Sequence, residues 1–307
     1  EETYSQHYQF LKKEEWLTFD EIIRLVRAFT QLGVKKVRLT GGEPLLRPDL
    51  PELIKELSQI SDIEDLALTT NGMLLKEFAA QLKQAGLKRL NLSLDTLDSR
   101  VFHLMNGHRG SVDDVLDGLK AAEAVGFQSV KINVVVQRGV NDNTIMDMVR
   151  YFRNTGHVLR FIEYMDVGTC NDWRYEYVVP SQEIINMIQR AFPLEPVGPN
   201  YSGEVAARYR LKDGSGEIGM VSSVSQPFCQ DCTRARLSAD GKFYTCLFAK
   251  EGVSLKEYAS AGYSDEELTH YIQSIWHKRE DRYSEIRSVN KEAKTERERV
   301  EMFNIGG

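Results

Sequence analysis

Hydrophobic and polar positions along residues 18–164 alternate between a helical pattern and a strand pattern. Residues 18–33 read TFDEIIRLVRAFTQLG, and Thr18 lies three residues before Glu21, the spacing of a helix-capping box. Residues 35–40 then predict a short strand. The same unit recurs four times, with helices expected at about 49–59, 74–85, 111–125 and 143–154 and strands at 65–70, 88–94, 129–136 and 157–164.

Glycines mark the ends of four of these predicted helices, at Gly33, Gly86, Gly126 and Gly156. Five strands separated by helices predict a parallel sheet that forms either a barrel or an open doubly wound sheet. Beyond residue 180 this rhythm stops, and a segment rich in Gly, Pro and Ser is followed by a charged, helical end. We therefore expect a domain boundary near residue 180, with domains at 1–180 and 181–307.

Composition and charge exclude several classes of protein. The chain has 307 residues, 42% hydrophobic and 27% charged, which suffices for one large α/β barrel or two domains. A net charge of -6 argues against a general nucleic-acid or membrane binder. No apolar run approaches the roughly 18 residues that span a bilayer, and no signal-peptide pattern opens the chain. These features, with four cysteines of which three are clustered, suit a reducing cytoplasm.

The clustered cysteines are Cys229, Cys232 and Cys246, a CxxC spacing with a third thiol fourteen residues later. Thiolates bind zinc and iron–sulfur clusters alike, so the residues alone leave both possibilities open. Zinc would need a fourth ligand, and His270 or His277 could reach the segment only by folding back. The remaining cysteine, Cys170, lies in an Asn/Asp/Gly loop, and we interpret it as an exposed bystander.

Polar and glycine residues are concentrated at the carboxyl ends of the predicted strands, where a parallel barrel carries its active site. TTNG at 69–72 is also explained by a turn. TGGEP at 40–44 is more informative, because adjacent glycines let the backbone approach a ligand closely. The other segments at strand ends are SLD (93–95), KIN (131–133) and RFIEYMDVG (160–168).

Four cations add a further signal. Arg38 and Lys131 interrupt apolar strands, a costly position unless each is paired, with Glu43 or Asp95 as candidate partners, or faces a ligand. Arg234 and Arg236 are two residues apart, so both side chains point to one side of an extended segment. Guanidinium groups match phosphate oxygens bidentately. Together the four cations favour a triphosphate site.

Six motifs in order carry a resemblance to a known family: RLTGGEPLLR, LTTNG, NLSLDTLD, FIEYMDVG, the cysteine segment with CTRAR, and the terminal Gly-Gly. Together they resemble the GTP 3',8-cyclases of molybdenum cofactor biosynthesis, which are radical S-adenosylmethionine (SAM) enzymes. The resemblance implies an incomplete (β/α)6 barrel with a C-terminal iron–sulfur domain. It also implies the activity, conversion of GTP to 3',8-cyclo-7,8-dihydro-GTP by a 5'-deoxyadenosyl radical that takes the ribose 3' hydrogen.

The resemblance also implies roles for individual residues. It assigns Cys229, Cys232 and Cys246 to an auxiliary [4Fe–4S] cluster whose fourth iron binds the guanine of the substrate. It assigns catalytic roles to Arg234, Arg236, Gly306 and Gly307, the last two through a tail that reaches into the active site. The SAM contacts that it implies are Gly42, Ser93 and Met165. The GTP contacts that it implies are Arg38, Thr69, Lys131, Arg160, Arg234 and Arg236.

Enzymes of this family carry a CxxxCxxC loop for a second [4Fe–4S] cluster, and no such spacing occurs in residues 1–307. We expect the loop upstream of Glu1 and expect residues 1–307 alone not to cleave SAM. The implied partners are GTP, an electron donor such as flavodoxin or ferredoxin, the next pathway enzyme (cyclic pyranopterin monophosphate synthase) and a second copy of the chain in a homodimer. The rival interpretations are another radical SAM enzyme with an auxiliary cluster and a zinc-stabilised binding module.

Overall fold

One curved sheet organises the protein. The computed structural model describes residues 11–168, 173–201, 203–260, 262–289 and 300–306. Its largest sheet has eight strands in the order β1-β2-β3-β4-β5-β8-β7-β6. The first six in this order are parallel, and β7 and β6 continue the sheet in antiparallel pairing. The strands are β1 (Lys36–Leu39), β2 (Asp65–Thr70), β3 (Arg89–Ser93), β4 (Lys131–Val136), β5 (Val158–Glu163), β6 (Leu194–Val197), β7 (Ala207–Leu211) and β8 (Glu217–Val221).

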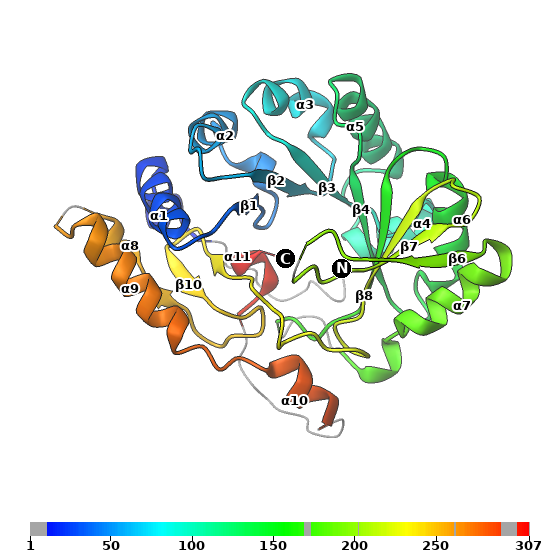
Figure 1. The fold of residues 1–307 in the computed structure, drawn as a ribbon. Helices are drawn as coiled ribbons and strands as arrows, with labels where there is room; N and C mark the ends of the chain where they lie inside the picture. The colour runs from blue at the N-terminus through cyan, green and yellow to red at the C-terminus, as the bar shows by residue number, and fades with distance from the viewer. Residues whose placement is uncertain (1–10, 169–172, 202, 261, 290–299, 307) are drawn as a thin grey trace.

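Helices cover the convex side of this arc, as Figure 1 shows, and the fold is the α/β partial barrel that the sequence predicts. The five predicted helix–strand units are confirmed, although the last helix begins with a 3-10 turn. α4 and α7 were not predicted. The helices of this part are α1 (Phe19–Gln31), α2 (Leu50–Ser58), α3 (Leu75–Gln84), α4 (Ser99–Asn106), α5 (Val112–Ala124), α6 (Ile145–Phe152) and α7 (Ser181–Ala191). The 3-10 helices are η1 (Lys13–Glu15), η2 (Pro44–Leu46), η3 (Asp142–Thr144) and η4 (Tyr175–Tyr177).

Local chemistry explains where the predicted helices begin and end. Thr18 caps α1 by accepting a hydrogen bond from the Glu21 backbone N–H, and the Glu21 carboxylate accepts one from the Thr18 N–H, so the capping box is formed. The four predicted terminal glycines all have φ between +78° and +97°, a conformation that side chains with a Cβ rarely adopt. The chain therefore turns from each of these helices into the next strand within a few residues.

The hydrophobic core lies between the sheet and its covering helices. Leu68, Leu92, Val134 and Phe161, at alternate positions of β2 to β5, are at most 1% exposed and pack with apolar residues of the helices. The alternate residues of the same strands face the concave side. Because successive side chains point to opposite faces, the sheet has one face that packs in the core and one face that can bind a ligand.

The C-terminal part lies across the concave side of the arc in Figure 1. A three-stranded sheet in the order β11-β10-β9 is followed by helices, of which α8 and α9 pack on α1. Arg24 of α1 secures this contact with hydrogen bonds to the Asp265 carboxylate (2.9 Å) and the Ser260 carbonyl (2.9 Å). These elements are β9 (Arg236–Leu237), β10 (Lys242–Tyr244), β11 (Val253–Ser254), α8 (Lys256–Ala259), α9 (Asp265–His277), α10 (Tyr283–Val289) and α11 (Met302–Ile305).

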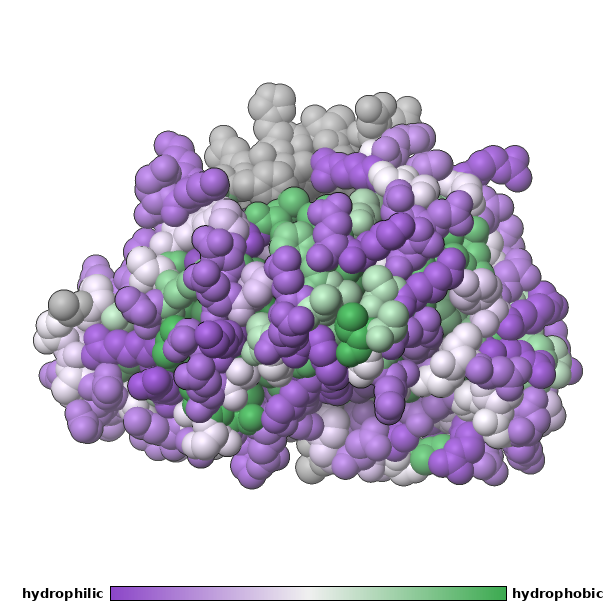
Figure 2. Space-filling view, turned by 90° about the horizontal axis from the view of Figure 1, so that it is seen from above, coloured by the Kyte–Doolittle hydropathy of each residue, from purple (hydrophilic) through white to green (hydrophobic). Residues whose placement is uncertain are grey.

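The main sheet continues through the predicted boundary at residue 180. β8, from the later segment, pairs in parallel with β5, and β6 and β7 extend the same sheet. The two predicted segments therefore share one sheet. The view onto the outer face in Figure 2 shows a mostly hydrophilic surface with smaller apolar areas. Among the described residues, no helix combines the length and apolarity needed to cross a bilayer.

Candidate functional site

The concave face of the sheet is polar, in contrast to its convex face. Strand register aligns Arg38 with Ala67 and Arg89, and aligns Thr69 with Asn91 and Lys131. Asn133 and Arg160 are neighbours one step further along. Alternation along the strands therefore gives the barrel interior a lining of charged and amide side chains. That lining comprises Lys36, Arg38, Asp65, Thr69, Arg89, Asn91, Ser93, Lys131, Asn133 and Arg160.

Positive charge predominates in this interior. Asp65 pairs with Arg89, but no carboxylate among the described residues lies within 4.0 Å of the charged groups of Arg38, Lys131 or Arg160. The Arg38 side chain is exposed to solvent, but protein atoms surround its guanidinium group on most sides. This enclosure, with repulsion from Arg160 and Arg234, lowers its pKa to about 10.

Lys131 shows the same effect. Burial, together with repulsion from Arg89 and Arg160, lowers the pKa of its ammonium group to about 8. Burial also lowers the pKa of Arg160. Repulsion among neighbouring cations lowers their pKa values. A bound anion would reduce this repulsion, because it supplies the missing opposite charge.

Unused hydrogen-bonding atoms accompany the cations. Within the described part of the chain, Asn91 Oδ1, Asn133 Oδ1 and Arg160 Nε are buried without a hydrogen-bond partner. Asn91 uses its amide N–H to donate to Thr69 Oγ1 at 3.1 Å. Buried polar atoms are normally paired, so these atoms mark positions where a polar ligand is needed.

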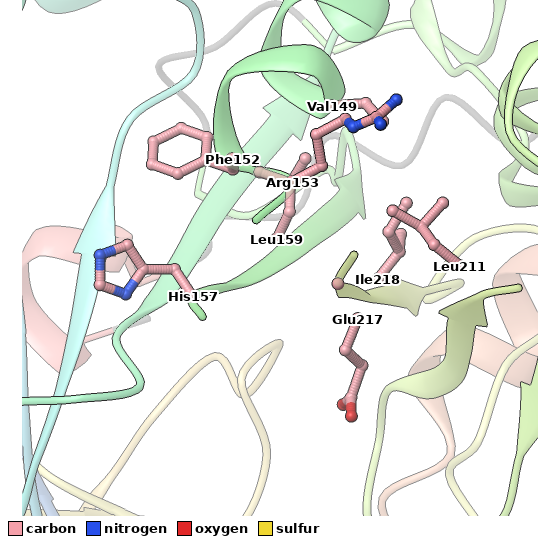
Figure 3. A pocket seen from close by; sticks show the side chains of 9 residues that line it. Val149, Phe152, Arg153, His157, Leu159, Leu211, Glu217 and Ile218 are labelled. Atoms are coloured by element: carbon pink, nitrogen blue, oxygen red, sulfur yellow. The ribbon is translucent and has the colours of Figure 1, made fainter. Parts of the chain in front are cut away.

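A cavity of about 200 Å³ opens beside Lys131 and Arg160. Asn200, Glu204 and Ala206, which precede β7, also line it, and the charge of Glu204 partly offsets the lowering of the pKa values of Lys131 and Arg160. A second, smaller cleft lies between α6, β5 and the β7–β8 pair and is lined mostly by apolar side chains (Figure 3). It is less polar than the cavity beside Lys131 and Arg160, which Glu204 and the Arg208–Glu217 ion pair also line, so the larger cavity is the candidate site.

Several lining residues were missed by the sequence analysis, and two predicted partners were wrong. Arg89 interrupts its strand as Arg38 does, and that pattern could have identified it. Glu43 pairs with neither cation, since it accepts hydrogen bonds from the backbone of Leu45 and Asn71 at 3.0 and 2.8 Å. Asp95 accepts from the Val135 N–H at 2.8 Å, and burial raises its pKa to about 6. Both acids hold loops at strand ends.

The residues predicted to contact SAM lie at the carboxyl-end side of the strands. Gly42 is exposed in the loop after β1, and Ser93 is exposed at the end of β3. Met165 follows β5 and packs against a small apolar cluster that includes Tyr244 and Ile305. Glu43 also accepts a hydrogen bond from Thr70 Oγ1 at 2.8 Å, which ties the TGGEP and TTNG segments together.

The three predicted cluster ligands lie in one neighbourhood. Cys229, Cys232 and Cys246 are part-buried thiols, and the Cys232 N–H donates to the Cys229 carbonyl at 3.2 Å in a tight turn. Burial raises the pKa of the Cys232 thiol, but the charge and hydrogen bonds of Arg234 outweigh it, and the pKa falls to about 7. Burial raises the pKa of the Cys246 thiol, and the charge of Cys229 raises it as well. The donor set fits a thiolate-bound iron–sulfur cluster.

Among the described residues, no three His, Cys, Asp or Glu side chains are arranged to hold one metal ion. His270 and His277 lie on α9. Cys170 lies outside the described residues.

Arg234 and Arg236 link the cysteine segment to the barrel interior. Arg234 Nε donates to Cys232 Sγ at 3.4 Å. Burial lowers the pKa of Arg236 to about 10, helped by repulsion from Arg234 and Arg38. The predicted cations therefore form a continuous array from the cysteine segment to Lys131.

The C-terminal tail reaches the same place. Helix α11 lies inside the arc in Figure 1, and the Gly306 carbonyl accepts a hydrogen bond from Arg236 Nε at 3.2 Å. Gly306 has φ of +70°, and a Cβ on it would lie 2.3 Å from Thr40 Cγ2. Only glycine fits this position without displacing β1 or the tail. Gly307 lies outside the described residues.

Comparisons with family models divide the chain in two. Residues 3–152 match the radical SAM superfamily, and residues 157–285 match the family described as Molybdenum Cofactor Synthesis C. Two solved structures share the fold at 15% identity. Streptococcus suis SuiB bound to S-adenosylmethionine has a TM-score of 0.58 and covers 87% of this chain and 62% of its own. AnSMEcpe with bound AdoMet and Cp18Cys peptide has a TM-score of 0.55, and the match covers 98% of this chain and 88% of the anSMEcpe chain.

Curated relatives give the more specific result. The GTP 3',8-cyclase of Xanthomonas campestris pv. campestris (strain 8004) is 54% identical over 97% of this chain and 86% of its own length. That of Staphylococcus saprophyticus subsp. saprophyticus is 48% identical over 100% of this chain and 90% of its own. Identity of this extent, along nearly the whole chain, establishes descent from a common enzyme. The chain belongs to the GTP 3',8-cyclase family of the radical SAM superfamily.

Proposed function

We propose that this protein is a radical SAM lyase that converts GTP to 3',8-cyclo-7,8-dihydro-GTP, the first step of molybdenum cofactor biosynthesis. The observation that carries the proposal is the array of unneutralised cations that runs from the three-cysteine segment into the barrel interior. A nucleoside triphosphate satisfies both ends of such a site, with its phosphates in the barrel and its base toward the thiols. In this proposal residues 1–180 supply strands β1 to β5 of the barrel, and residues 181–307 complete its sheet and supply the auxiliary cluster and part of the GTP site.

The triphosphate is held by the cations. Arg38, Lys131 and Arg160 contribute charge from the sheet, and Arg234 and Arg236 contribute it from the cysteine segment. Thr69 adds a hydroxyl on the same face of the sheet. Since guanidinium groups bind phosphate oxygens in pairs, this arrangement orients the nucleotide as well as binding it.

SAM occupies the strand-end face in this proposal. Gly42 offers exposed backbone atoms, Ser93 a hydroxyl and Met165 an apolar thioether surface. SAM, cleaved with an electron from a [4Fe–4S] cluster, supplies the 5'-deoxyadenosyl radical that starts the cyclisation. The protein residues align GTP with it and keep water away from the reacting ribose.

The auxiliary [4Fe–4S] cluster is held by Cys229, Cys232 and Cys246. Three thiolates leave one position of the cluster open, and we assign that position to the guanine of the substrate. The tail, with Gly306 against Thr40 and Arg236, closes the site. A second [4Fe–4S] cluster, which cleaves SAM, is also part of the proposal.

Further partners follow from this function. We propose flavodoxin or ferredoxin as electron donor, cyclic pyranopterin monophosphate synthase as the enzyme that takes the product, and the cytoplasm as the place of action. A homodimer is also part of the proposal.

The direct test of the function uses the full-length protein with its clusters assembled under anaerobic conditions. With GTP, SAM and a strong reductant, it should form 3',8-cyclo-7,8-dihydro-GTP and 5'-deoxyadenosine, detected by mass spectrometry. Replacing Cys229 by Ala should lower the bound iron and remove the cyclised product, and Cys170→Ser should do neither. Absence of the cyclised nucleotide with both clusters present would refute the function.

Loss of one phosphate contact should weaken GTP binding. A hydrogen bond to a charged group contributes roughly 1.5–3 kcal/mol, so Arg234→Ala and Arg38→Ala should each raise the Kd for GTP about ten- to a hundredfold. Calorimetry with GTP and with guanosine separates the phosphate contribution from that of the base. Arg138→Ala, which removes a surface pair with Glu183, is the control and should leave both affinities unchanged. An unchanged GTP affinity in Arg234→Ala would exclude the phosphate role.

GTP affinity should also depend on pH through Lys131. With its pKa lowered to about 8, its ammonium group is charged below that pH and neutral above it. Phosphate binding needs the charged form, so affinity should fall by about tenfold between pH 7 and pH 9. Lys131→Arg keeps its charge over this range, and its GTP affinity should vary much less with pH. Equal pH profiles for the two proteins, measured by calorimetry, would disprove the assignment.

The tail should be required for cyclisation. Gly306→Ala introduces a Cβ that contacts Thr40, and deletion of Gly306 and Gly307 removes the carbonyl that Arg236 binds. Both changes should leave the iron content unchanged and abolish cyclisation. Gly198→Ala is the matched control, since nothing lies within 4 Å of its added Cβ. A deletion variant that cyclises GTP at the normal rate would show that the tail is dispensable.

A further inference from the structure

A fully buried carboxylate ends strand β5. Glu163 is 0% exposed and lies on the convex side of the sheet, opposite to Arg160. One of its oxygens accepts from the Ser181 N–H (2.7 Å) and from the hydroxyls of Ser181 (3.0 Å) and Ser225 (2.5 Å). The other accepts from the N–H groups of Val224 and Ser225, both at 2.8 Å. No cation among the described residues pairs with it, so these five hydrogen bonds hold the charge.

These bonds connect β5 with the start of the cysteine segment. Ser181 is the first residue of α7, and Val224 and Ser225 follow β8, five and four residues before Cys229. An amide cannot replace the carboxylate. Three backbone N–H groups point at its two oxygens, so the NH₂ of a glutamine would face at least one of them. A buried carboxylate is costly, and its retention here indicates that it fixes one specific arrangement.

Asp166, three residues later, makes a second connection. It is 6% exposed, forms an ion pair with Arg287 of α10 and accepts a hydrogen bond from Tyr283 Oη at 2.5 Å. Arg287 also donates to the Ser223 carbonyl at 2.6 Å. Helix α10 is thereby bonded both to the residues after β5 and to the residue before Val224.

Aromatic rings extend this connection to the third cysteine. The Arg287 guanidinium lies 5.2 Å from the ring centre of Phe248, which stacks on Tyr283 at 4.6 Å. The Phe248 N–H donates to Cys246 Sγ at 3.4 Å. Both sides of the three-cysteine segment are therefore anchored to the four residues 163–166, which also include Met165.

We infer that Glu163 and Asp166 are positioning residues that set the distance and angle of the three-cysteine segment relative to the strand-end face of the barrel. Neither carboxylate touches substrate in this assignment. Each fixes backbone that carries a cluster ligand, and together they couple the two halves of the site through β5. This inference rests on the proposed function, since it concerns where the guanine end of GTP lies relative to the ribose-attacking radical.

The test uses the full-length protein with both clusters and compares Glu163→Gln, Asp166→Asn and wild type. Misplacement of the segment lets SAM be cleaved without productive cyclisation, so the ratio of 5'-deoxyadenosine to cyclised nucleotide should rise. Displacements near 1 Å can cost about a hundredfold in rate, so we expect cyclisation per SAM cleaved to fall by about ten- to a hundredfold. Partial unfolding would lower both products together and leave the ratio unchanged.

A second readout needs no turnover. Hydrogen exchange at the Val224 and Ser225 N–H groups should be faster in Glu163→Gln than in wild type, with iron content retained. Arg24→Ala is the control for stability, because it removes a guanidinium bonded to a carboxylate and to carbonyls at the remote contact of α1 with α8 and α9. It should leave the product ratio unchanged.

Chemical rescue separates the two anchors and covers the case in which Glu163→Gln does not fold. In Arg287→Ala, added guanidinium ion should restore the product ratio by binding between Asp166 and the aromatic rings, whereas it should not restore Glu163→Gln. Wild-type ratios in Asp166→Asn and Glu163→Gln would overturn the inference while leaving the function intact. Absence of cyclised product in wild type would instead overturn the function.

Discussion

Positive charge inside the barrel is the constraint on which the rest of the structure depends. Arg38, Lys131 and Arg160 share one concave surface, where the charge of Arg160 lowers the pKa values of Arg38 and Lys131 and the carboxylates of Asp65 and Glu204 offset the positive charge only in part. Such an array is tolerated because the opposite face of the same strands is an extensive apolar core, which stabilises the sheet independently of what the interior contains. The unfavourable interior is then available to bind an anion, and ligand binding removes the repulsion that folding left in place.

The C-terminal part completes this interior from the open side. Helices α8 and α9 pack on α1, and the three-cysteine segment brings Arg234 and Arg236 up to Arg38. Arg236 lies at the junction, since its guanidinium faces the cation array and also holds the Gly306 carbonyl. Tail, cysteine segment and barrel therefore meet at one side chain, and this explains why motifs so distant along the chain belong to one site.

The sequence predicted the parts of this structure that depend on local chemistry. Strands β1 to β5 and their helices follow from apolar periodicity and terminal glycines, and Arg38 and Lys131 were recognisable as charges in apolar strands. Strands β6 to β8 were not resolved individually, because a Gly- and Pro-rich segment gives a weak pattern and its pairing depends on distant strands. For the same reason Glu43 and Asp95 were assigned wrong partners. The contact of Gly306 with Thr40 depends on the folded path of the tail, which no local pattern encodes.

Strand β5 contributes both to the charged interior of the barrel and to the anchoring of the three-cysteine segment. Arg160 and Glu163 are three residues apart, so they project to opposite faces of the sheet. The arginine contributes to the interior that binds an anion, and the glutamate anchors the backbone that leads to Cys229. A slip of one residue in the pairing of β5 with β8 would place the glutamate among the cations and the arginine in the core. Register is therefore under functional as well as structural constraint here, because the same pairing sets the charge of the site and the position of the three-cysteine segment.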